Sequence, residues 1–249
     1  IQHQHHQNNM GAFGGPDIVT DGLVFAVDAG STRSYPGSGT TATSLVGSTT
    51  GTLTNGVGFS ANNGGTFTFD GIDDYVNMGD TSFTDFGTSN FTIEAFLYIP
   101  SDITPSTGHY KGVVVKKGAS GANAGMGIYY NTGHEKFLWS TANGSSGVER
   151  FTTNSFGDLL GTYIHVVMVR DSSATNNGHF YINGVYESIT SGGSLMNVDN
   201  NYNLVLGASS TLYGAYFLEG NIPIARIYNK ALSAAEVTQN YNAQKNRFI

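Results

Sequence analysis

Cysteine is absent from the sequence, proline occurs 5 times, tryptophan once, and only 12% of the residues are charged. Without cysteine, the chain has neither disulfide bridges nor thiolate metal ligands. Charged residues reach about half of their usual share, so serine, threonine, asparagine and glycine must cover most of the surface. No apolar run approaches the roughly 18 residues that indicate a membrane-spanning helix, and we therefore expect no membrane partner.

Basic residues are scarce as well. The chain has 11 lysines and arginines against 18 aspartates and glutamates, which gives a net charge of −7. Binding to the phosphate groups of a nucleic acid needs a basic patch, and lysine and arginine form no cluster along this sequence. We therefore expect no nucleic-acid partner.

The acidic residues do not form a catalytic pattern. A glycosidase needs two carboxylates about 5 to 10 Å apart, and on one strand such a pair stands two or four residues apart. No glutamate has such a partner on its own strand; the glutamates are Glu94, Glu135, Glu149, Glu187, Glu219 and Glu236. Nucleophile-elbow and phosphate-loop motifs are also missing. The sequence predicts no enzyme.

The residues that are present favour antiparallel β structure. Hydrophobic residues make up 39% of the chain and aromatic residues 12%, and 34 glycines supply turns. The predicted strands cover 22–29, 66–69, 75–78, 91–99, 113–117, 125–131, 136–141, 148–152, 163–170, 203–207 and 219–228. Residues 30–63 are expected to be loops with one or two short edge strands. These features predict an all-β, antiparallel two-sheet sandwich of the jelly-roll type.

Two features of the later strands are specific. Asn183-Gly184, between apolar residues on both sides, predicts a two-residue type I′ hairpin turn within 179–188. The strand at 163–170 is apolar on both faces, which is typical of a central strand. His165 within it fits a hydrogen-bonded core histidine better than a ligand or a base.

One C-terminal helix is predicted over 232–248. Ser233 is its N-cap, and Glu236 three residues later completes a capping box. Leu232 and Val237 stand at the positions of a hydrophobic staple, and Val237 and Tyr241 are expected to dock the helix on the sandwich.

Three carboxylates stand within five residues of the stretch from Gly65 to Gly79. The alternation before and after Asp70-Gly71-Ile72-Asp73 predicts a β-hairpin, with Asp70, Asp73 and Asp74 in its turn. They either cap the turn or bind Ca²⁺, which takes several carboxylate and carbonyl oxygens. A calcium site needs further donors, and Glu219 and Asn221 are the candidates.

The first 16 residues differ in composition from the rest. They are rich in glutamine and histidine and lack any hydrophobic period. We expect residues 1–16 to form an extended arm that docks on a partner, and residues 17–249 to form the β-sandwich domain. His3, His5 and His6 leave metal binding open as an alternative. A chain that starts at Ile1 instead of Met is expected to derive from a longer precursor.

Four segments, in this order, resemble laminin-G-like domains of the concanavalin A-like group. They are 69–76 (Phe-Asp-Gly-Ile-Asp-Asp-Tyr-Val), 91–96 (Phe-Thr-Ile-Glu-Ala-Phe), 180–184 (Phe-Tyr-Ile-Asn-Gly) and 225–233 (Ala-Arg-Ile-Tyr-Asn-Lys-Ala-Leu-Ser). The resemblance implies a lectin-like sandwich over about residues 21–245, often with Ca²⁺ at its rim. The start at 19–30 and the end at 240–243 (Asn-Tyr-Asn-Ala) also resemble domains of bacteriophage virion proteins.

Two functions follow as hypotheses. The first is a non-catalytic structural protein of a virus particle, a phage capsid decoration or fibre subunit on the virion surface, whose partners are other virion proteins and possible glycans. The alternative is an extracellular carbohydrate-binding or adhesion module. Its aromatic platforms would be Tyr110, Trp139, Tyr213 and Tyr216, although Trp139 fits a core residue better.

Overall fold

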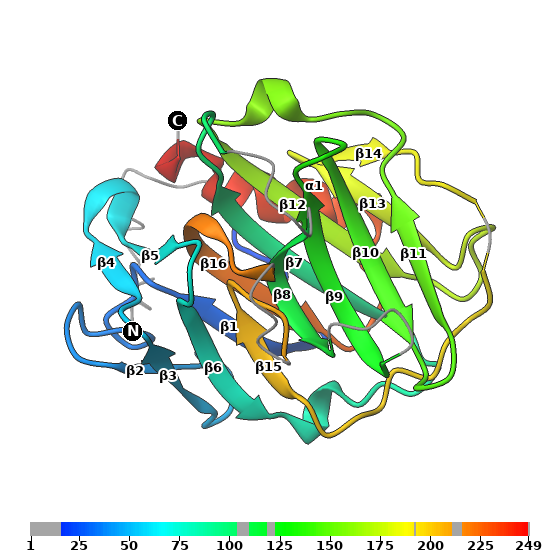
Figure 1. The fold of residues 1–249 in the computed structure, drawn as a ribbon, viewed down its shortest axis with the longest axis horizontal. Coiled ribbons are helices and arrows are strands. Elements are labelled where there is room, and N and C mark those ends of the chain that lie inside the picture. Colours follow the sequence, from blue (N-terminus) through cyan, green and yellow to red (C-terminus); the bar gives the residue numbers. More distant parts are fainter. Residues whose placement is uncertain (1–15, 104–109, 119–122, 192, 211–215, 249) are drawn as a thin grey trace, which may run out of the picture.

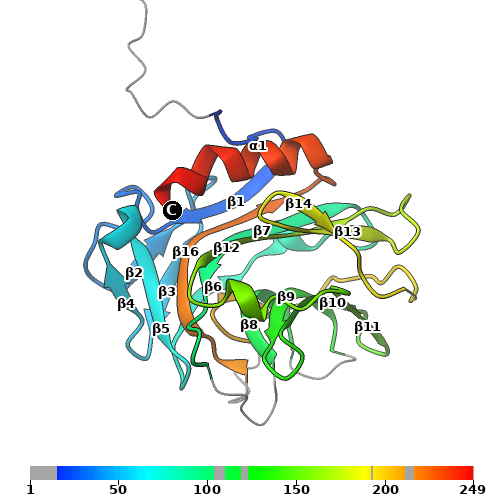
Figure 2. The ribbon, with the colours of Figure 1, turned by 90° about the horizontal axis from the view of Figure 1, so that it is seen from above.

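The computed structural model describes residues 16–103, 110–118, 123–191, 193–210 and 216–248. These residues form two antiparallel β-sheets that pack face to face (Figure 1). Figure 2 shows the helix α1 (Ala234–Gln244) lying across the outer face of one sheet, with the second sheet on the opposite side. The predicted all-β sandwich with a short C-terminal helix is confirmed.

Each sheet has eight strands, and the sheet that carries α1 is called sheet A. Its order is β14 (Val185–Glu187), β13 (Gly178–Ile182), β12 (Tyr163–Arg170), β7 (Phe91–Tyr98), β16 (Glu219–Tyr228), β5 (Thr66–Asp70) and β4 (Gly58–Ser60), and β1 (Leu23–Asp28) pairs with β16. Sheet B runs β11 (Gly147–Phe151), β10 (Lys136–Ala142), β9 (Gly125–Asn131), β8 (Tyr110–Lys117), β15 (Asn203–Leu206), β6 (Tyr75–Asp80), β3 (Thr50–Thr54) and β2 (Thr41–Thr43). Short 3₁₀ turns are η1 (Asn62–Gly64), η2 (Ser82–Thr84), η3 (Gly157–Leu159) and η5 (Lys245–Arg247).

The predicted hairpin around Asp70–Asp74 is wrong. Strand β5 pairs with β16 and β4 in sheet A, whereas β6 pairs with β3 and β15 in sheet B. The turn therefore crosses from one sheet to the other. Alternation along β5 and β6 shows only that each strand has one apolar face, and here Phe67 and Val76 on those faces meet in the core between the sheets.

Residues 30–63 contain three strands, where one or two edge strands were expected. β2 and β4 are edge strands, but β3 lies between β2 and β6 inside sheet B. Gly51 of β3 packs so closely on β6 that an added Cβ would lie 2.3 Å from Sδ of Met78. A glycine-containing strand gives a weak sequence signal, which explains why the pattern underestimated it.

The core lies between the inner faces of the sheets, and β12 is buried on both faces. Val166 and Met168 point into that core, while Val167 and Val169 belong to a second cluster with Val237 of α1. β12 lies between β7 and β13, so its predicted central position is confirmed. The turn that connects β13 and β14 has φ of 51° at Asn183 and 77° at Gly184, as the predicted type I′ turn requires.

Helix α1 begins as predicted and ends earlier. Ser233 accepts a hydrogen bond from N of Glu236, and the Glu236 side chain accepts one from N of Ser233, so the capping box is present. Leu232 and Val237 lie in one apolar cluster, which confirms the staple. The α-helix ends at Gln244 and continues as the 3₁₀ turn η5. Among the described residues, no helix has the length and apolar character needed to cross a membrane.

Candidate functional site

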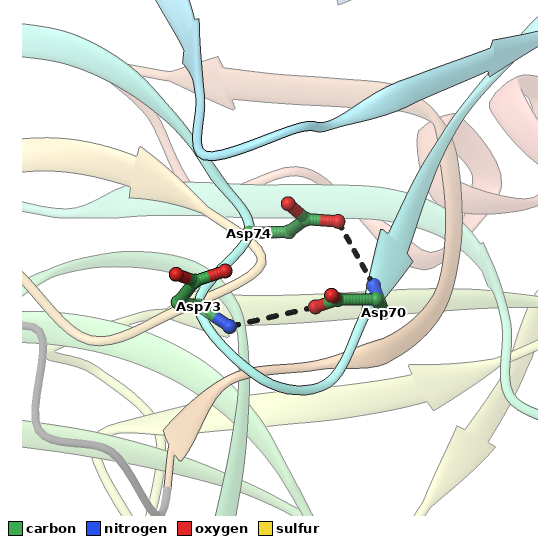
Figure 3. A group of neighbouring side chains, drawn as sticks. All are labelled: Asp70, Asp73 and Asp74. Atoms are coloured by element: carbon green, nitrogen blue, oxygen red, sulfur yellow. Dashed lines mark hydrogen bonds between the residues drawn. The ribbon is translucent and has the colours of Figure 1, made fainter.

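The three carboxylates of the inter-sheet turn lie together (Figure 3). One ligand atom from each of Asp70, Asp73 and Asp74 lies within 4.8 Å of the other two. Oδ1 of Asp70 accepts from N of Ile72 at 2.8 Å, and Oδ2 of Asp74 accepts from N of Asp70 at 3.1 Å. Both anticipated roles are thus compatible with the geometry: two carboxylates cap the turn, and all three stay close enough to share a cation.

Asp74 has an oxygen that the turn does not use. The residue is only 4% exposed, and its Oδ1 has no hydrogen-bond partner among the described residues. Burial raises the pKa of Asp74, and the charges of Asp70 and Asp73 add to this, although the hydrogen bond from the Asp70 amide opposes it. A divalent ion would relieve both the repulsion and the unpaired oxygen.

Of the two predicted additional donors, Glu219 lies outside this group of carboxylates, whereas Asn221 as a donor stays a prediction. Glu219 lies opposite Asp70 in the pairing of β16 with β5, but its carboxylate is not among the gathered oxygens and interacts with the charge of Lys111. Nδ2 of Asn221 lies 3.5 Å from the hydroxyl oxygen of Tyr163. The remaining ligands of a cation at the turn would be backbone carbonyls, water or the predicted Asn221.

A buried ion pair lies under α1. Oε1 of Glu94 accepts from Nη1 of Arg226 at 2.9 Å and lies 2.9 Å from Nε2 of His165, while Oε2 accepts from Nδ2 of Asn240 at 2.7 Å. Burial by itself raises the pKa of Glu94, but Arg226, His165 and Asn240 together lower it to about 2. Because Asn240 belongs to α1 and Glu94 to β7, their hydrogen bond holds the helix on the sheet. Glu94 and His165 are both 0% exposed, so His165 is the hydrogen-bonded core histidine that was predicted.

Tyrosines gather on the outer face of sheet B and form what we call the tyrosine cluster: Tyr110, Tyr129 and Tyr216. The rings of Tyr110 and Tyr216 stack, with centroids 5.7 Å apart and planes 7° apart. Tyr129 meets both edge-on. The hydroxyl of Tyr110 donates to Oε2 of Glu149 on β11 at 3.1 Å. Burial, followed by the charge of Glu149, raises the pKa of Tyr110 to about 12, so its hydroxyl stays protonated at neutral pH.

The other two predicted platforms do not join this cluster. Trp139 is 1% exposed and packs in the core between the sheets, with the Arg150 guanidinium 4.9 Å from its ring centroid. The prediction that Trp139 is a sugar platform is therefore wrong, because alternation along β10 turns Leu138 outward and Trp139 inward. Tyr213 lies outside the described residues.

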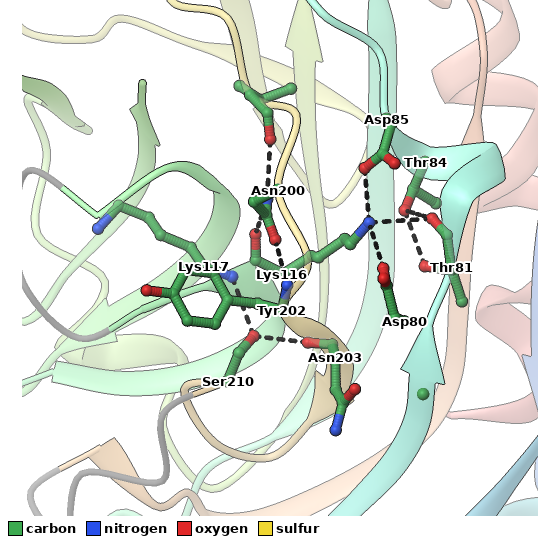
Figure 4. A network of polar contacts seen from close by, with 12 residues as sticks. Asp80, Thr81, Thr84, Asp85, Lys116, Lys117, Asn200, Tyr202, Asn203 and Ser210 are labelled. Atoms are coloured by element: carbon green, nitrogen blue, oxygen red, sulfur yellow. Dashed lines mark hydrogen bonds and ion pairs between the residues drawn. The ribbon is translucent and has the colours of Figure 1, made fainter. Parts of the chain in front are cut away.

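The ammonium group of a lysine lies among several oxygen atoms at the end of β6. Nζ of Lys116 lies 3.1 Å from Oδ1 of Asp80, 2.6 Å from Oδ1 of Asp85 and 3.0 Å from O of Thr81 (Figure 4). The lysine side chain is fully buried. Two carboxylates and a carbonyl are oxygen donors of the kind that Ca²⁺ takes. The single positive charge of Lys116 offsets one of the two carboxylate charges.

Sequence reasoning missed Lys116 and the role of Glu149. Alternation in 147–151 places Glu149 and Phe151 on one face, but only the sheet order brings that face next to Tyr110. Lys116 and Asp85 are separated by 31 residues and carry no shared motif. Neither contact has a local sequence signal.

Known structures share this fold. The binding domain of Paraclostridial mosquitocidal protein 1 matches with a TM-score of 0.67 and 17% identity, over 89% of this chain and 52% of that one. The binding domain of botulinum neurotoxin serotype G matches with a TM-score of 0.66 and 15% identity, over 88% and 50%. Trypanosoma rangeli sialidase, in complex with 2,3-difluorosialic acid, matches with a TM-score of 0.62 and 14% identity, over 94% and 35%.

At these identities the similarity shows the fold alone. The chain spans about half the length of the toxin binding domains and about a third of the sialidase. No curated protein matches it by sequence. Residues 69–238, by contrast, match a laminin G family whose description is "Concanavalin A-like lectin/glucanases superfamily". The four segments, the two-sheet architecture and this match agree, and the chain belongs to the concanavalin A-like lectin/glucanases superfamily.

Proposed function

We propose that the protein is a non-catalytic glycan-binding module whose sugar-contacting surface is the tyrosine cluster. The observation that carries the proposal is the stacked pair Tyr110 and Tyr216 beside the Glu149 carboxylate. Aromatic rings accept the C–H face of a sugar, while a carboxylate and phenol hydroxyls bind its hydroxyl groups. The lectin-like family supports this function.

The structural neighbours are consistent with this function. Two are named as binding domains, and the sialidase has been solved with sialic acid. Because the chain spans only part of each, hydrolytic activity is not carried over. The paired carboxylates that a glycosidase needs are also absent from its strand patterns.

A glycan array probed with the full chain tests the proposal. We expect at least one glycan class to bind, and Tyr216→Ala and Tyr110→Ala to weaken binding about two- to tenfold, since an aromatic contact contributes roughly 0.5–1.5 kcal/mol. Tyr186→Ala, which removes a 53% exposed tyrosine on β14 of sheet A, is the matched control. Full binding by both cluster variants, or no binding by the wild type, would reject the proposal.

The sequence also favours a structural role in a virus particle, in which residues 1–16 would be the segment that docks on a partner. Residues 17–19, which follow this segment, are bound to α1. Nε2 of Gln239 donates to O of Asp17 at 2.7 Å, and N of Val19 donates to Oδ1 of Asn240 at 2.7 Å. A segment that precedes Asp17 therefore leaves the sandwich from a defined position on its outer face.

The inter-sheet turn is proposed as a calcium site. Support comes from the three gathered carboxylates and from the unpartnered, buried Oδ1 of Asp74. Three carboxylates do not fill the six to eight positions that Ca²⁺ takes, so the ion would also take carbonyl oxygens or water. Its function would be to hold the two sheets together at this rim.

A further inference from the structure

A depression on the β4 side of sheet A lies apart from the tyrosine cluster on sheet B. Its volume is about 330 Å³, and it is formed by the loop that follows β1, by β4 and by the turn that leads into β5. This volume falls at the lower end of the range of small-molecule sites, roughly 300–1,000 Å³. It suits a ligand with a single ring.

One wall of the depression is aromatic and fixed. The ring centroids of Tyr35 and Phe59 lie 5.2 Å apart. Tyr35 also packs edge-on against Phe67 at 5.2 Å, and its hydroxyl donates to O of Gly39 at 2.8 Å. Phe59 is only partly buried, so part of its ring faces the depression.

Arg247 joins the opposite walls. Its Nη1 donates to both carboxylate oxygens of Asp28, each at 2.8 Å, just before the loop that follows β1. Its Nε and Nη2 donate to O of Asn63 at 2.7 Å and to O of Gly65 at 2.8 Å, in the turn before β5. A planar guanidinium makes these bonds in one geometry, so the depression keeps its shape without a ligand, which lowers the entropic cost of binding.

The described residues that line the depression provide no unpaired charge for a ligand. None of the described residues that form it is ionisable apart from the Tyr35 phenol, and the guanidinium of Arg247 is neutralised by Asp28. A charged ligand would therefore lose hydration without gaining an ion pair. A neutral ring with one apolar face would meet Phe59 on that face, and its hydroxyl groups would meet the Thr32 hydroxyl and the backbone of the lining glycines.

We propose that this depression binds a neutral monosaccharide, free or at the end of a glycan. It is a second sugar site, independent in position from the tyrosine cluster. A charged sugar such as sialic acid is excluded from it because the described lining residues include no unpaired cation.

The test uses isothermal titration and saturation-transfer NMR on the full chain with glucose, galactose, mannose, N-acetylglucosamine and sialic acid. Ala61→Leu fills the depression, and its backbone at φ −75° accepts leucine without strain. Phe59→Ala removes the exposed part of the aromatic wall. Ala235→Leu, on the exposed side of α1, is the matched control. We expect one neutral sugar to bind the wild type, at least tenfold weaker binding by Ala61→Leu and by Phe59→Ala, and unchanged binding by the control.

Tyr216→Ala separates this site from the tyrosine cluster. Binding of the neutral sugar that survives Tyr216→Ala but is lost in Ala61→Leu supports the second site, even where the cluster binds nothing. Binding that survives Ala61→Leu and is lost in Tyr216→Ala overturns it and leaves the cluster alone. Failure of every neutral sugar to bind, or tighter binding of sialic acid in the depression, also overturns it. Unchanged melting temperatures show that each variant is folded.

Discussion

At the residue scale, Glu94 shows how this fold accommodates a charge in its interior. The carboxylate is 0% exposed, yet Arg226, His165 and Asn240 lower its pKa to about 2 from an ordinary value of 4.5. The group thus contributes stability at pH above about 4.5, and this contribution is lost as the pH falls toward 2.

Glu94→Gln should lower the free energy of unfolding by about 3 kcal/mol at pH 7, because it leaves the Arg226 guanidinium buried without its counter-charge. Urea titrations of wild type and variant between pH 7 and pH 2 measure the difference. We expect that difference to shrink as the pH falls through the range in which Glu94 takes up its proton. A difference that does not change with pH would contradict the ionised state of Glu94.

The pKa of Asp74 is shifted in the opposite direction to that of Glu94. Because burial raises its pKa, the folded protein holds the proton to a higher pH than the unfolded chain does. The free energy of unfolding therefore falls as the pH rises from the unfolded-state pKa of this carboxyl through its folded-state pKa, and a bound cation would remove this effect.

The calcium proposal is tested by thermal melts in millimolar Ca²⁺ and in chelator. Extracellular calcium sites have dissociation constants of roughly 10⁻⁴ to 10⁻³ M, so we expect Ca²⁺ to raise the melting temperature of the wild type by a few degrees and that of Asp73→Ala not at all. Asp158→Ala, at an exposed aspartate of η3, should respond as the wild type does. Identical wild-type melts in both buffers would leave turn capping as the only role of the three aspartates.

At the element scale, α1 joins the N-terminal end of the described chain to sheet A. Asn240 accepts from N of Val19 and donates to Glu94 of β7, while Val237 packs with Val167 and Val169 of β12. Helix formation and docking on sheet A therefore depend on each other.

The cap of this helix makes a separate contribution. Ser233→Ala should lower the free energy of unfolding by about 1 kcal/mol, because it removes the acceptor for N of Glu236 and half of the capping box. Urea unfolding measures the change, and Ser48→Ala, at an exposed loop serine, serves as the control. Equal stability of the two variants would show that packing alone holds the helix end.

At the scale of the whole molecule, the sandwich and its N-terminal arm are expected to act independently. Deletion of residues 1–15 keeps Asp17 and Val19 in their contacts with α1, so the melting temperature should stay nearly unchanged while co-assembly with a partner is weakened. Calorimetry measures the first effect and light scattering of the mixed components the second. A large loss of stability in the truncated chain would place the arm in the fold.

The sequence by itself determined the elements whose signals are local. The Asn183-Gly184 turn, the capping box of Ser233 and Glu236 and the buried strand at 163–170 each depend on residues within a few positions of one another, so their physical causes are visible in the chain. The two-sheet class follows from such strands taken together. The carboxylates of the turn gather because they are neighbours in sequence.

Tertiary structure alone decided which strands pair and which distant side chains meet. Alternation in β5 and β6 fits a hairpin as well as a crossing between sheets, and only packing of both apolar faces in one core selects the crossing. Three kinds of contact join residues far apart in the chain: the stacking of Tyr110 on Tyr216, the ion pairs of Lys116, and the hydrogen bonds from Arg247 to Asp28. Such contacts have no local signal, because the register of the sheets sets the distances between them.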